Sequence, residues 1–237
     1  MEKKTSVLIA EDDLQLAFIL KDNLEEEGFD VVHCPDGDAA WESFLRKQPD
    51  ICLLDVNMPS RDGFSLTKKI RQKSDVVPII LITAKSMEED KLTGFERGAD
   101  DYITKPFSMK ELLSRMQVFL RRNKMLMPDT ATIYKIGHLD FFPNENRIIK
   151  NGEEIILTQK ETQLLQFFCS HPNKVVKRED ILQHVWGKND YFLGRSMDVF
   201  IAKLRKLLKG EETVGIETIH HAGYRFNIQT EINSAAD

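Results

Sequence analysis

The sequence lacks a long apolar run. No stretch approaches the roughly 18 to 20 apolar residues that a membrane helix needs. The start, MEKKTSVLIAEDD, turns acidic after only four apolar residues. These two features argue against a membrane span and against a signal peptide. We therefore expect a soluble protein of the cytoplasm.

The sequence also has little cysteine. Cys34, Cys52 and Cys169 are odd in number, far apart and not in CxxC pairs, which argues against a disulfide framework and a zinc site. The six histidines do not indicate a metal site either, because His220 and His221 are adjacent and the others lack ligand spacing. We assign no histidine a metal role.

A strong bias of charge is absent too. The net charge is -5 over 237 residues, and hydrophobic residues make up 41%, which are ordinary values for a globular protein. The basic residues are nevertheless concentrated, because residues 195–209 hold five Lys or Arg against Asp198 alone. Contact with DNA requires such a local basic footprint. At this length, two domains are the natural expectation.

Short apolar strands alternate with amphipathic helices over residues 1–122. The predicted strands are 7–10, 31–33, 51–55, 79–83 and 101–104. The predicted helices are 13–27, 36–47, 61–73, 86–97 and 108–122. Continuous apolar runs suit a sheet that is covered on both faces. The order therefore predicts an α/β domain with a doubly wound, five-stranded parallel sheet of the flavodoxin type.

A different pattern follows a predicted linker at residues 123–132, where helical periodicity stops at a Pro-Asp turn signal. Strands and turns are expected over 133–157, with Asn151-Gly152 as a two-residue hairpin turn. Helices are predicted at 159–170, 178–186 and 195–208, and final strands at 217–220 and 224–228. This order predicts a second, α+β domain over 133–230, followed by a tail at 231–237.

The carboxyl ends of the predicted parallel strands carry reactive side chains. Ligands of open parallel sheets bind at that edge, and the residues there are Glu11, Asp12, Asp13, Asp55, Thr83 and Lys105. Several carboxylates held together need a hard cation, and Mg²⁺ fits because it takes one or two carboxylates plus waters and phosphate oxygens. A nucleophilic carboxylate can also accept a phosphoryl group as an acyl phosphate.

On this interpretation Asp55 is the nucleophile. Asp12 and the backbone carbonyl of Asn57 hold the metal together with Asp55, and Glu11 helps through a water molecule. Lys105 pairs with the phosphoryl group.

Three further roles are expected near this edge of the sheet. The Thr83 hydroxyl would donate a hydrogen bond to the phosphoryl group once it arrives. Asp13 precedes a helix, so helix capping is its expected role. The Lys105-Pro106 bond is a candidate cis peptide that re-aims the lysine, because cis bonds are essentially a proline phenomenon.

The segments EDD, LLDVNMP, LITA and ITKPF, at these intervals, resemble the receiver domain of two-component response regulators over residues 5–122. The resemblance implies that a sensor histidine kinase phosphorylates Asp55 and that Mg²⁺ is required. It also implies a switch pair, in which Thr83 moves toward the phosphate and Tyr102 rotates inward behind it. Such a protein catalyses only its own phosphoryl transfer and dephosphorylation. Asn57 departs from the methionine that is common at its position.

Residues 91–122 are similar to the same region of the OmpR/PhoB subfamily, whose active receivers form two-fold dimers. Carried over, Lys91 with Glu111 and Asp101 with Arg115 would be intermolecular pairs. Exposed ion pairs contribute only about 0 to 1 kcal/mol each, so their expected role is specificity and register. Phosphorylation would then promote dimerisation and place two DNA-binding domains on tandem half-sites, which raises affinity by avidity.

The predicted helix at 195–208 has one apolar face and one basic face. The apolar face, at 3 to 4 residue spacing, holds Met197, Phe200, Ile201, Leu204, Leu207 and Leu208. The opposite side carries Ser196, Val199, Lys203 and Lys206. Lysine can donate to guanine in the major groove, so the helix is a candidate for DNA contact. A solvated basic helix is the alternative.

The segments LTQKETQLLQFF, VVKREDILQHVWG, RSMDVFIAKLRKLL and IETIHHAGYRF resemble the winged helix-turn-helix domain of the OmpR/PhoB family. The resemblance implies that 195–208 is the recognition helix in double-stranded DNA and that 187–194 is a loop that can meet RNA polymerase. Phosphates would be contacted by Arg195, Ser196 and Arg205, and base edges by Val199 and Lys203. His220 stands where the family's wing commonly shows arginine, and would replace it with a pH-sensitive charge.

Three other classes of protein are alternatives to this interpretation. A haloacid-dehalogenase-like phosphatase also uses an aspartate nucleophile with Mg²⁺, but Asn57 stands where its general acid is needed and cannot protonate a leaving group. A flavodoxin-like FMN carrier needs hydrogen-bond donors in the first loop to bind the phosphate of the flavin, but that loop is acidic in this chain. A receiver that acts purely through protein contacts would show no DNA binding.

Overall fold

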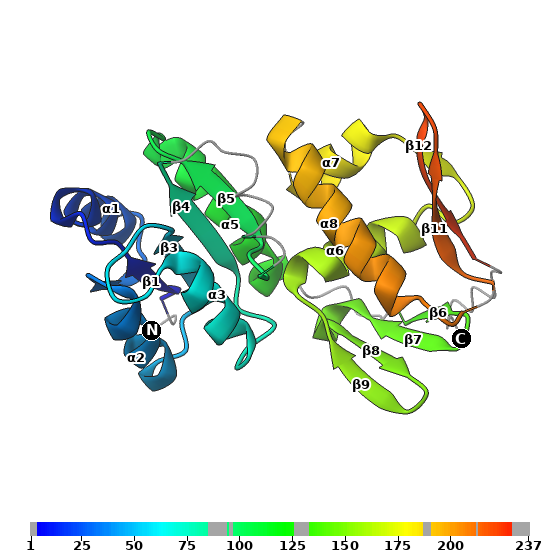
Figure 1. Cartoon of the computed structure of the whole chain (residues 1–237), viewed down its shortest axis with the longest axis horizontal. Helices are drawn as coiled ribbons and strands as arrows, with labels where there is room; N and C mark the ends of the chain where they lie inside the picture. The colour runs from blue at the N-terminus through cyan, green and yellow to red at the C-terminus, as the bar shows by residue number, and fades with distance from the viewer. Residues whose placement is uncertain are drawn as a thin grey trace. The chain divides into compact units, whose positions relative to one another are not determined.

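The protein is described from a computed structural model, which gives residues 4–84, 94, 97–125, 133–186, 191–211 and 213–228 (Figure 1). The chain divides into two compact units, Met1–Asn123 and Lys124–Asp237. Each unit has its own core and is described by itself. Within the described ranges, no helix has the length and apolar character needed to cross a membrane.

A five-stranded parallel sheet forms the centre of the first unit, as the sequence predicts. Its strands are β1 (Ser6–Ala10), β2 (Asp30–Cys34), β3 (Ile51–Asp55), β4 (Ile79–Thr83) and β5 (Asp101–Thr104). They lie in the order β2-β1-β3-β4-β5. Every residue of β1, β3 and β4 is buried, which explains their continuous apolar sequences.

Helices cover both faces of this sheet. They are α1 (Leu14–Glu26), α2 (Gly37–Arg46), α3 (Gly63–Arg71) and α5 (Met109–Met125). Val7 and Ile9 pack in one cluster with residues of α1 and α5. Leu8 and Ala10 alternate with them along β1, so they point to the other face, where α2 contacts β1 and β2.

The helix boundaries of the first unit follow local signals. Asp13 caps α1, as predicted, because its side chain accepts hydrogen bonds from Gln15 N and Leu16 N. The last helix continues to Met125, three residues beyond its predicted end at Arg122. Most of the helix predicted at 86–97 lies outside the described residues.

The second unit begins with a four-stranded antiparallel sheet in the order β6-β7-β8-β9. Its elements are β6 (Tyr134–Ile136), β7 (Leu139–Phe142), the short 3-10 helix η1 (Pro143–Glu145), β8 (Arg147–Lys150) and β9 (Glu153–Ile156). Asn151 and Gly152 join β8 to β9 with φ values of 52° and 82°. Positive φ at both positions is what a type I′ hairpin turn needs, and this confirms the turn prediction.

Three helices and a second sheet complete this unit. The helices are α6 (Gln159–Cys169), α7 (Arg178–Trp186) and α8 (Tyr191–Leu207), and the strands are β10 (Val175–Val176), β11 (Gly215–Ile219) and β12 (Gly223–Asn227). The sheet has the order β10-β12-β11. We call the hairpin of β11 and β12 the wing. The two-domain fold class predicted from the sequence, with an α+β winged-helix second domain, is therefore confirmed.

Two elements of the second unit differ from the sequence prediction. Strand β10 was not predicted, because two residues are too few to show an alternating pattern. Helix α8 begins at Tyr191 rather than Arg195, so the predicted loop at 187–194 is wrong for residues 191–194. Gly194 lowers the helix propensity of that first turn, which obscured its start in the sequence. Residues 187–190 of the loop lie outside the described part of the chain.

Candidate functional site

Three carboxylates meet at the carboxyl edge of the parallel sheet. Ligand oxygens of Glu11, Asp12 and Asp55 all lie within 4.8 Å of one another. Strands β1 and β3 are neighbours in register, so the residues that end or follow them are brought together. Glu11 and Asp55 are buried and Asp12 is exposed. Burying two carboxylates side by side is costly unless cations accompany them.

Lys105 supplies one cation to this site. Its Nζ lies 2.6 Å from Asp55 Oδ2 and 2.8 Å from Glu11 Oε2. The lysine directly follows β5, and its peptide bond to Pro106 is cis, as predicted. The sequence prediction paired Lys105 with a phosphoryl group, and the structure places it against the carboxylate that would receive that group.

The pKa values follow from this packing. Burial raises the pKa of Glu11 from 4.5 to about 7, and the charge of Asp55 adds to the rise, although the hydrogen bond from Lys105 lowers it. Burial alone would lower the pKa of Lys105. Its hydrogen bonds to Asp55 and Glu11 outweigh that effect, so the pKa of Lys105 is raised and the ammonium stays charged.

The Asp55 side chain is held by the backbone that follows it. Asn57 N donates to Asp55 Oδ1 at 3.1 Å, while Lys105 donates to Oδ2. Helix α3 begins close by, where Gly63 N donates to Val56 O at 3.0 Å. A Cβ atom at Gly63 would lie only 2.2 Å from the Asp55 carbonyl oxygen. Glycine at this position therefore allows α3 to approach the end of β3.

The two predicted switch residues lie on adjacent strands. Thr83 ends β4 and is fully buried. Tyr102 lies on β5 and is 5% exposed, so it is buried. A Cβ atom at Gly94 would lie 3.4 Å from Tyr102 Cε2, which shows how closely the chain passes that ring.

The residues predicted to join two receivers are paired within the chain. Arg115 lies 3.1 Å from Asp101 and 2.8 Å from Glu111. Both carboxylates raise the pKa of Arg115 against the effect of burial. Ion pairs with a second copy of the receiver would have to replace these contacts within the chain, so the intermolecular pairs stay a prediction. Lys91, the fourth residue of the set, lies outside the described residues.

The predicted DNA-contacting helix α8 buries its apolar face as expected. Met197, Phe200, Ile201, Leu204 and Leu208 are buried, whereas Leu207 is only partly buried. Val199 is partly exposed, and Ala202 and Lys206 are exposed on the side opposite the core.

Two basic residues of α8 contact neighbouring elements. Lys203 lies 3.8 Å from Glu161 of α6. Arg205 donates to Ile216 O at 2.9 Å and to Thr218 Oγ1 at 2.7 Å, so it contacts β11.

The remaining predicted DNA contacts lie at the start of α8 and in the wing. His220 is exposed in the turn of the wing, with its ring 6.2 Å from that of His221. The backbone of Arg195 and Ser196 is helical, but their side chains are outside the described part of the structure. The contacts predicted for the three residues stay predictions.

Family models match both units of the chain. The response regulator receiver domain matches residues 7–117, and the C-terminal domain of transcriptional regulatory proteins matches residues 152–226. The transcriptional regulatory protein RprY of Bacteroides fragilis is 41% identical over 225 residues, with 95% of each chain covered. The chain is a response regulator of the OmpR/PhoB family. It is a transcriptional regulator with a phospho-accepting receiver and a DNA-binding domain, and not a catalytic enzyme.

Other relatives of this response regulator span both domains as well. The phosphate regulon transcriptional regulatory protein PhoB of Shigella flexneri is 36% identical, with 93% of this chain and 97% of that protein covered. The crystal structure of DrrB, an OmpR/PhoB homologue of Thermotoga maritima, is 29% identical and covers 95% of this chain with a TM-score of 0.50. These matches extend the family assignment over most of the response regulator, including both domains.

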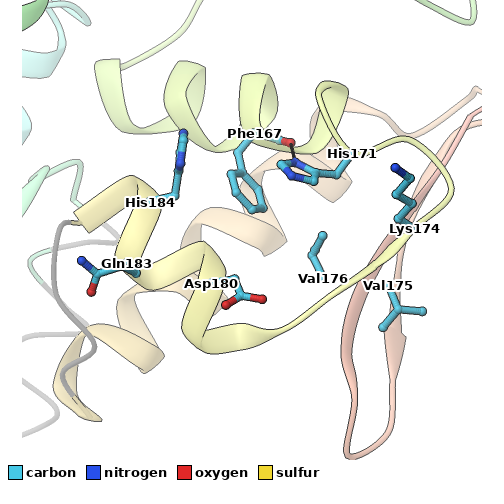
Figure 2. Close-up of a pocket in the computed structure, with 8 residues that line it drawn as sticks. All are labelled: Phe167, His171, Lys174, Val175, Val176, Asp180, Gln183 and His184. Carbon is cyan, nitrogen blue, oxygen red and sulfur yellow. Dashed lines mark hydrogen bonds between the residues drawn. The ribbon is translucent and has the colours of Figure 1, made fainter.

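The DNA-binding unit of the response regulator also has an open hollow of about 770 Å³ between α6, β10 and α7. Figure 2 shows the Phe167 ring between the two histidines of this hollow. Its centre lies 4.5 Å from that of His171 and 4.9 Å from that of His184. His171 Nδ1 also lies 2.9 Å from Phe167 O, so the histidine donates to that carbonyl. These contacts give both histidine rings a packing role.

The sequence analysis missed several residues of the response regulator that hold its sites in place. Gly63 is one, although a glycine at a helix start is visible in the sequence. Arg178 and Tyr224 are two others, and both contact Asp198 of α8. No local pattern connects these three positions, because each lies on a different element.

Proposed function

We propose that Asp55 is the residue that accepts the phosphoryl group, with Mg²⁺ held by Asp12, Asp55, Glu11 through water and the backbone carbonyl of Asn57. The observation that carries this proposal is the contact of Asp55 with Lys105, 2.6 Å away, beside two further carboxylates. The donor set is made of oxygen atoms, which is what Mg²⁺ prefers. When bound, the ion would neutralise charge on the transferred group.

Other residues orient Asp55 and bind the transferred phosphoryl group. Asn57 N and Lys105 each bind one oxygen of Asp55, which fixes the carboxylate in orientation. When a phosphohistidine of a sensor histidine kinase is the donor, the nitrogen–phosphorus bond breaks, a bond between phosphorus and an Asp55 oxygen forms, and the imidazole leaves. Lys105 then moves from the carboxylate to a phosphoryl oxygen. Thr83, at the end of the adjacent strand, donates a hydrogen bond to the same group.

We propose that the output is dimerisation of the phosphorylated receiver in the cytoplasm, which places two DNA-binding domains on tandem half-sites. Contact with RNA polymerase, through the segment before α8, then links DNA binding to transcription. Light scattering with and without Mg²⁺ and beryllofluoride tests the first step. A shift from monomer to dimer that Asp55→Ala abolishes is the expected result. A monomer with the phosphoryl mimic demonstrably bound would remove dimerisation from the proposal.

The raised pKa of Glu11 predicts a pH-dependent affinity for Mg²⁺. Below about pH 7 Glu11 is largely protonated, so the site has one negative charge fewer and binds the cation more weakly. Binding of Mg²⁺ at that lower pH displaces the proton of Glu11. Above about pH 7 the carboxylate is already ionised, so the affinity is higher and binding releases no proton from Glu11. Titration calorimetry at pH 6 and pH 8, in two buffers of different ionisation enthalpy, measures both effects. An affinity that does not change across this range would contradict the assignment of Glu11.

An apolar patch on α1 predicts where the kinase docks. Leu14, Phe18 and Ile19 are 68%, 69% and 51% exposed, and α1 begins directly after Asp12 and Asp13. Exposed apolar patches of this kind mark contact with other proteins.

Phe18→Ala is expected to slow phosphorylation by the kinase about tenfold, because one large apolar contact contributes about 1 to 2 kcal/mol to binding. Phosphorylation by a small phosphodonor should be unchanged, since it needs no docking surface. Leu45→Ala is the matched control, because Leu45 is 54% exposed on α2. Equal slowing with both donors would instead place Phe18 in the receiver's own chemistry.

A further inference from the structure

Three side chains from separate elements of the DNA-binding unit form a closed ring of hydrogen bonds. Arg178 opens α7, Asp198 lies on α8 and Tyr224 lies on β12. The Arg178 guanidinium donates to both oxygens of Asp198 at 2.7 Å, and to the Tyr224 hydroxyl at 2.7 Å. That hydroxyl donates to Asp198 Oδ1 at 2.9 Å. We call these residues the helix–wing triad.

The geometry and protonation of the triad suit a fixed joint. A guanidinium and a carboxylate joined by two parallel hydrogen bonds are set in angle as well as in distance. The hydrogen bond to Asp198 raises the pKa of Arg178, which stays charged. Burial, together with Asp198, raises the pKa of Tyr224, so the hydroxyl keeps the proton that it donates.

A second contact lies on the same flank of α8. Arg205 follows Asp198 by seven residues, which is about two helical turns. It donates to Ile216 O and Thr218 Oγ1 of β11. This flank of α8 is therefore attached to both strands of the wing, at points two turns apart. The partly exposed Val199 and the exposed Ala202 and Lys206 lie outside these contacts.

We propose that Asp198 is a positioning residue for DNA binding. Through Arg178 and Tyr224 it sets the angle between α8 and the wing, so that both elements reach the duplex together. The inference rests on the proposed role of α8 as the helix that contacts DNA. An acidic side chain on such a helix repels phosphates. Arg178 neutralises that charge, so Asp198 can hold α8 against the wing without repelling the duplex.

The test compares two variants that each remove one negative charge from the unit. They are Asp198→Ala and Glu179→Ala, and Glu179 is exposed in the first turn of α7. Loss of a negative charge alone should tighten DNA binding in both. The triad predicts that Asp198→Ala instead weakens binding about tenfold, as a small misplacement of contacting groups does. Glu179→Ala should bind as tightly as the unaltered chain, or tighter.

Binding is measured by fluorescence anisotropy, with the full chain and a duplex that the unaltered chain selects from a random pool. Hydroxyl-radical footprints give a second readout. In Asp198→Ala the protection made by the wing should be lost while protection in the adjacent major groove persists. Tightening in both variants, or an unchanged footprint, would overturn the triad. A chain that selects no duplex would overturn the proposed role of α8 itself.

Two further variants keep the test decisive if Asp198→Ala disturbs folding, which circular dichroism detects. Tyr224→Phe removes only the hydroxyl and should weaken binding in the same direction by about threefold, because the hydroxyl's two hydrogen bonds, from Arg178 and to Asp198, are lost while the ion pair remains. The exchange Arg178→Asp with Asp198→Arg restores the ion pair in reverse. Binding recovered in the double variant, relative to either single one, is expected. Additive losses would show that the pair does not act as a joint.

Discussion

Replacing Lys105 by methionine is expected to lower the free energy of unfolding of the receiver by about 3 kcal/mol at pH 8 without Mg²⁺, because removing one partner of a buried ion pair leaves uncompensated charge. Asp55 and Glu11 both depend on this lysine, and their side chains are only 6% and 1% exposed. Phosphorylation should be lost as well, since the cation that receives the phosphoryl oxygens is gone. Urea unfolding and incorporation of a radioactive phosphoryl group measure the two effects.

The loss of stability in Lys105→Met should depend on pH and on Mg²⁺. Without the lysine the pKa of Glu11 rises further above 7, because its hydrogen bond and charge no longer lower it. Below that pKa Glu11 is protonated, so the penalty shrinks as the pH falls toward 6. Mg²⁺ should also restore stability, because it replaces the missing countercharge.

Lys110→Met is the control for this effect, since Lys110 is exposed on α5. It should change stability by less than about 0.5 kcal/mol, as surface substitutions usually do. A penalty in Lys105→Met that is the same at pH 6 and pH 8 would contradict the coupling to Glu11.

Gly63→Ala is expected to destabilise the receiver by about 3 kcal/mol, at the upper end of overpacking changes. The new Cβ would lie 2.2 Å from the Asp55 carbonyl oxygen and 2.9 Å from its carbonyl carbon. Backbone atoms cannot rotate away, so either α3 or the end of β3 must move. Because the displaced backbone is that of the phosphoacceptor, phosphorylation should slow about tenfold or more, as an error of about 1 Å in position suffices for that.

Thermal unfolding and phosphorylation by a small phosphodonor measure the consequences of Gly63→Ala. Gly215→Ala is the matched control, because nothing lies within 4 Å of its added Cβ. The control should be within about 0.5 kcal/mol of the unaltered chain. A Gly63→Ala protein with normal stability and normal phosphorylation would show that α3 can be displaced without cost to the site.

The sequence predicts the receiver and its acidic site well for a physical reason. Strands β1, β3 and β4 are largely continuous apolar runs, and the short strand β5 runs directly into Lys105. The strand ends mark the edge of the sheet, so Asp55, Thr83 and Lys105 can be placed together from strand ends alone. The contact between Lys105 and Glu11 could not be predicted in the same way. It depends on side-chain direction, which strand boundaries do not give.

The DNA-binding unit shows where sequence reasoning reaches its limit. The apolar face of α8 is visible as a helical repeat, and its buried residues are largely those predicted. The roles of its polar residues depend on neighbours that are distant in the chain. Arg205 contacts the wing and Lys203 lies near Glu161, and neither partner has a local signal in the sequence. The helical spacing that predicts an outer basic face could not show which lysines and arginines already have protein partners.

The two-residue strand β10 has a consequence for the order in which the DNA-binding unit folds. Val176 pairs with Tyr224, so this ladder closes a loop that contains α7, α8 and β11. The β8–β9 hairpin, by contrast, closes across the two residues Asn151 and Gly152. Closing a long loop costs more chain entropy and slows the pairing. The wing therefore joins β10 late in folding, after the helices that lie between β10 and the wing have docked. An incompletely folded chain then presents α8 without the neighbour that orients it.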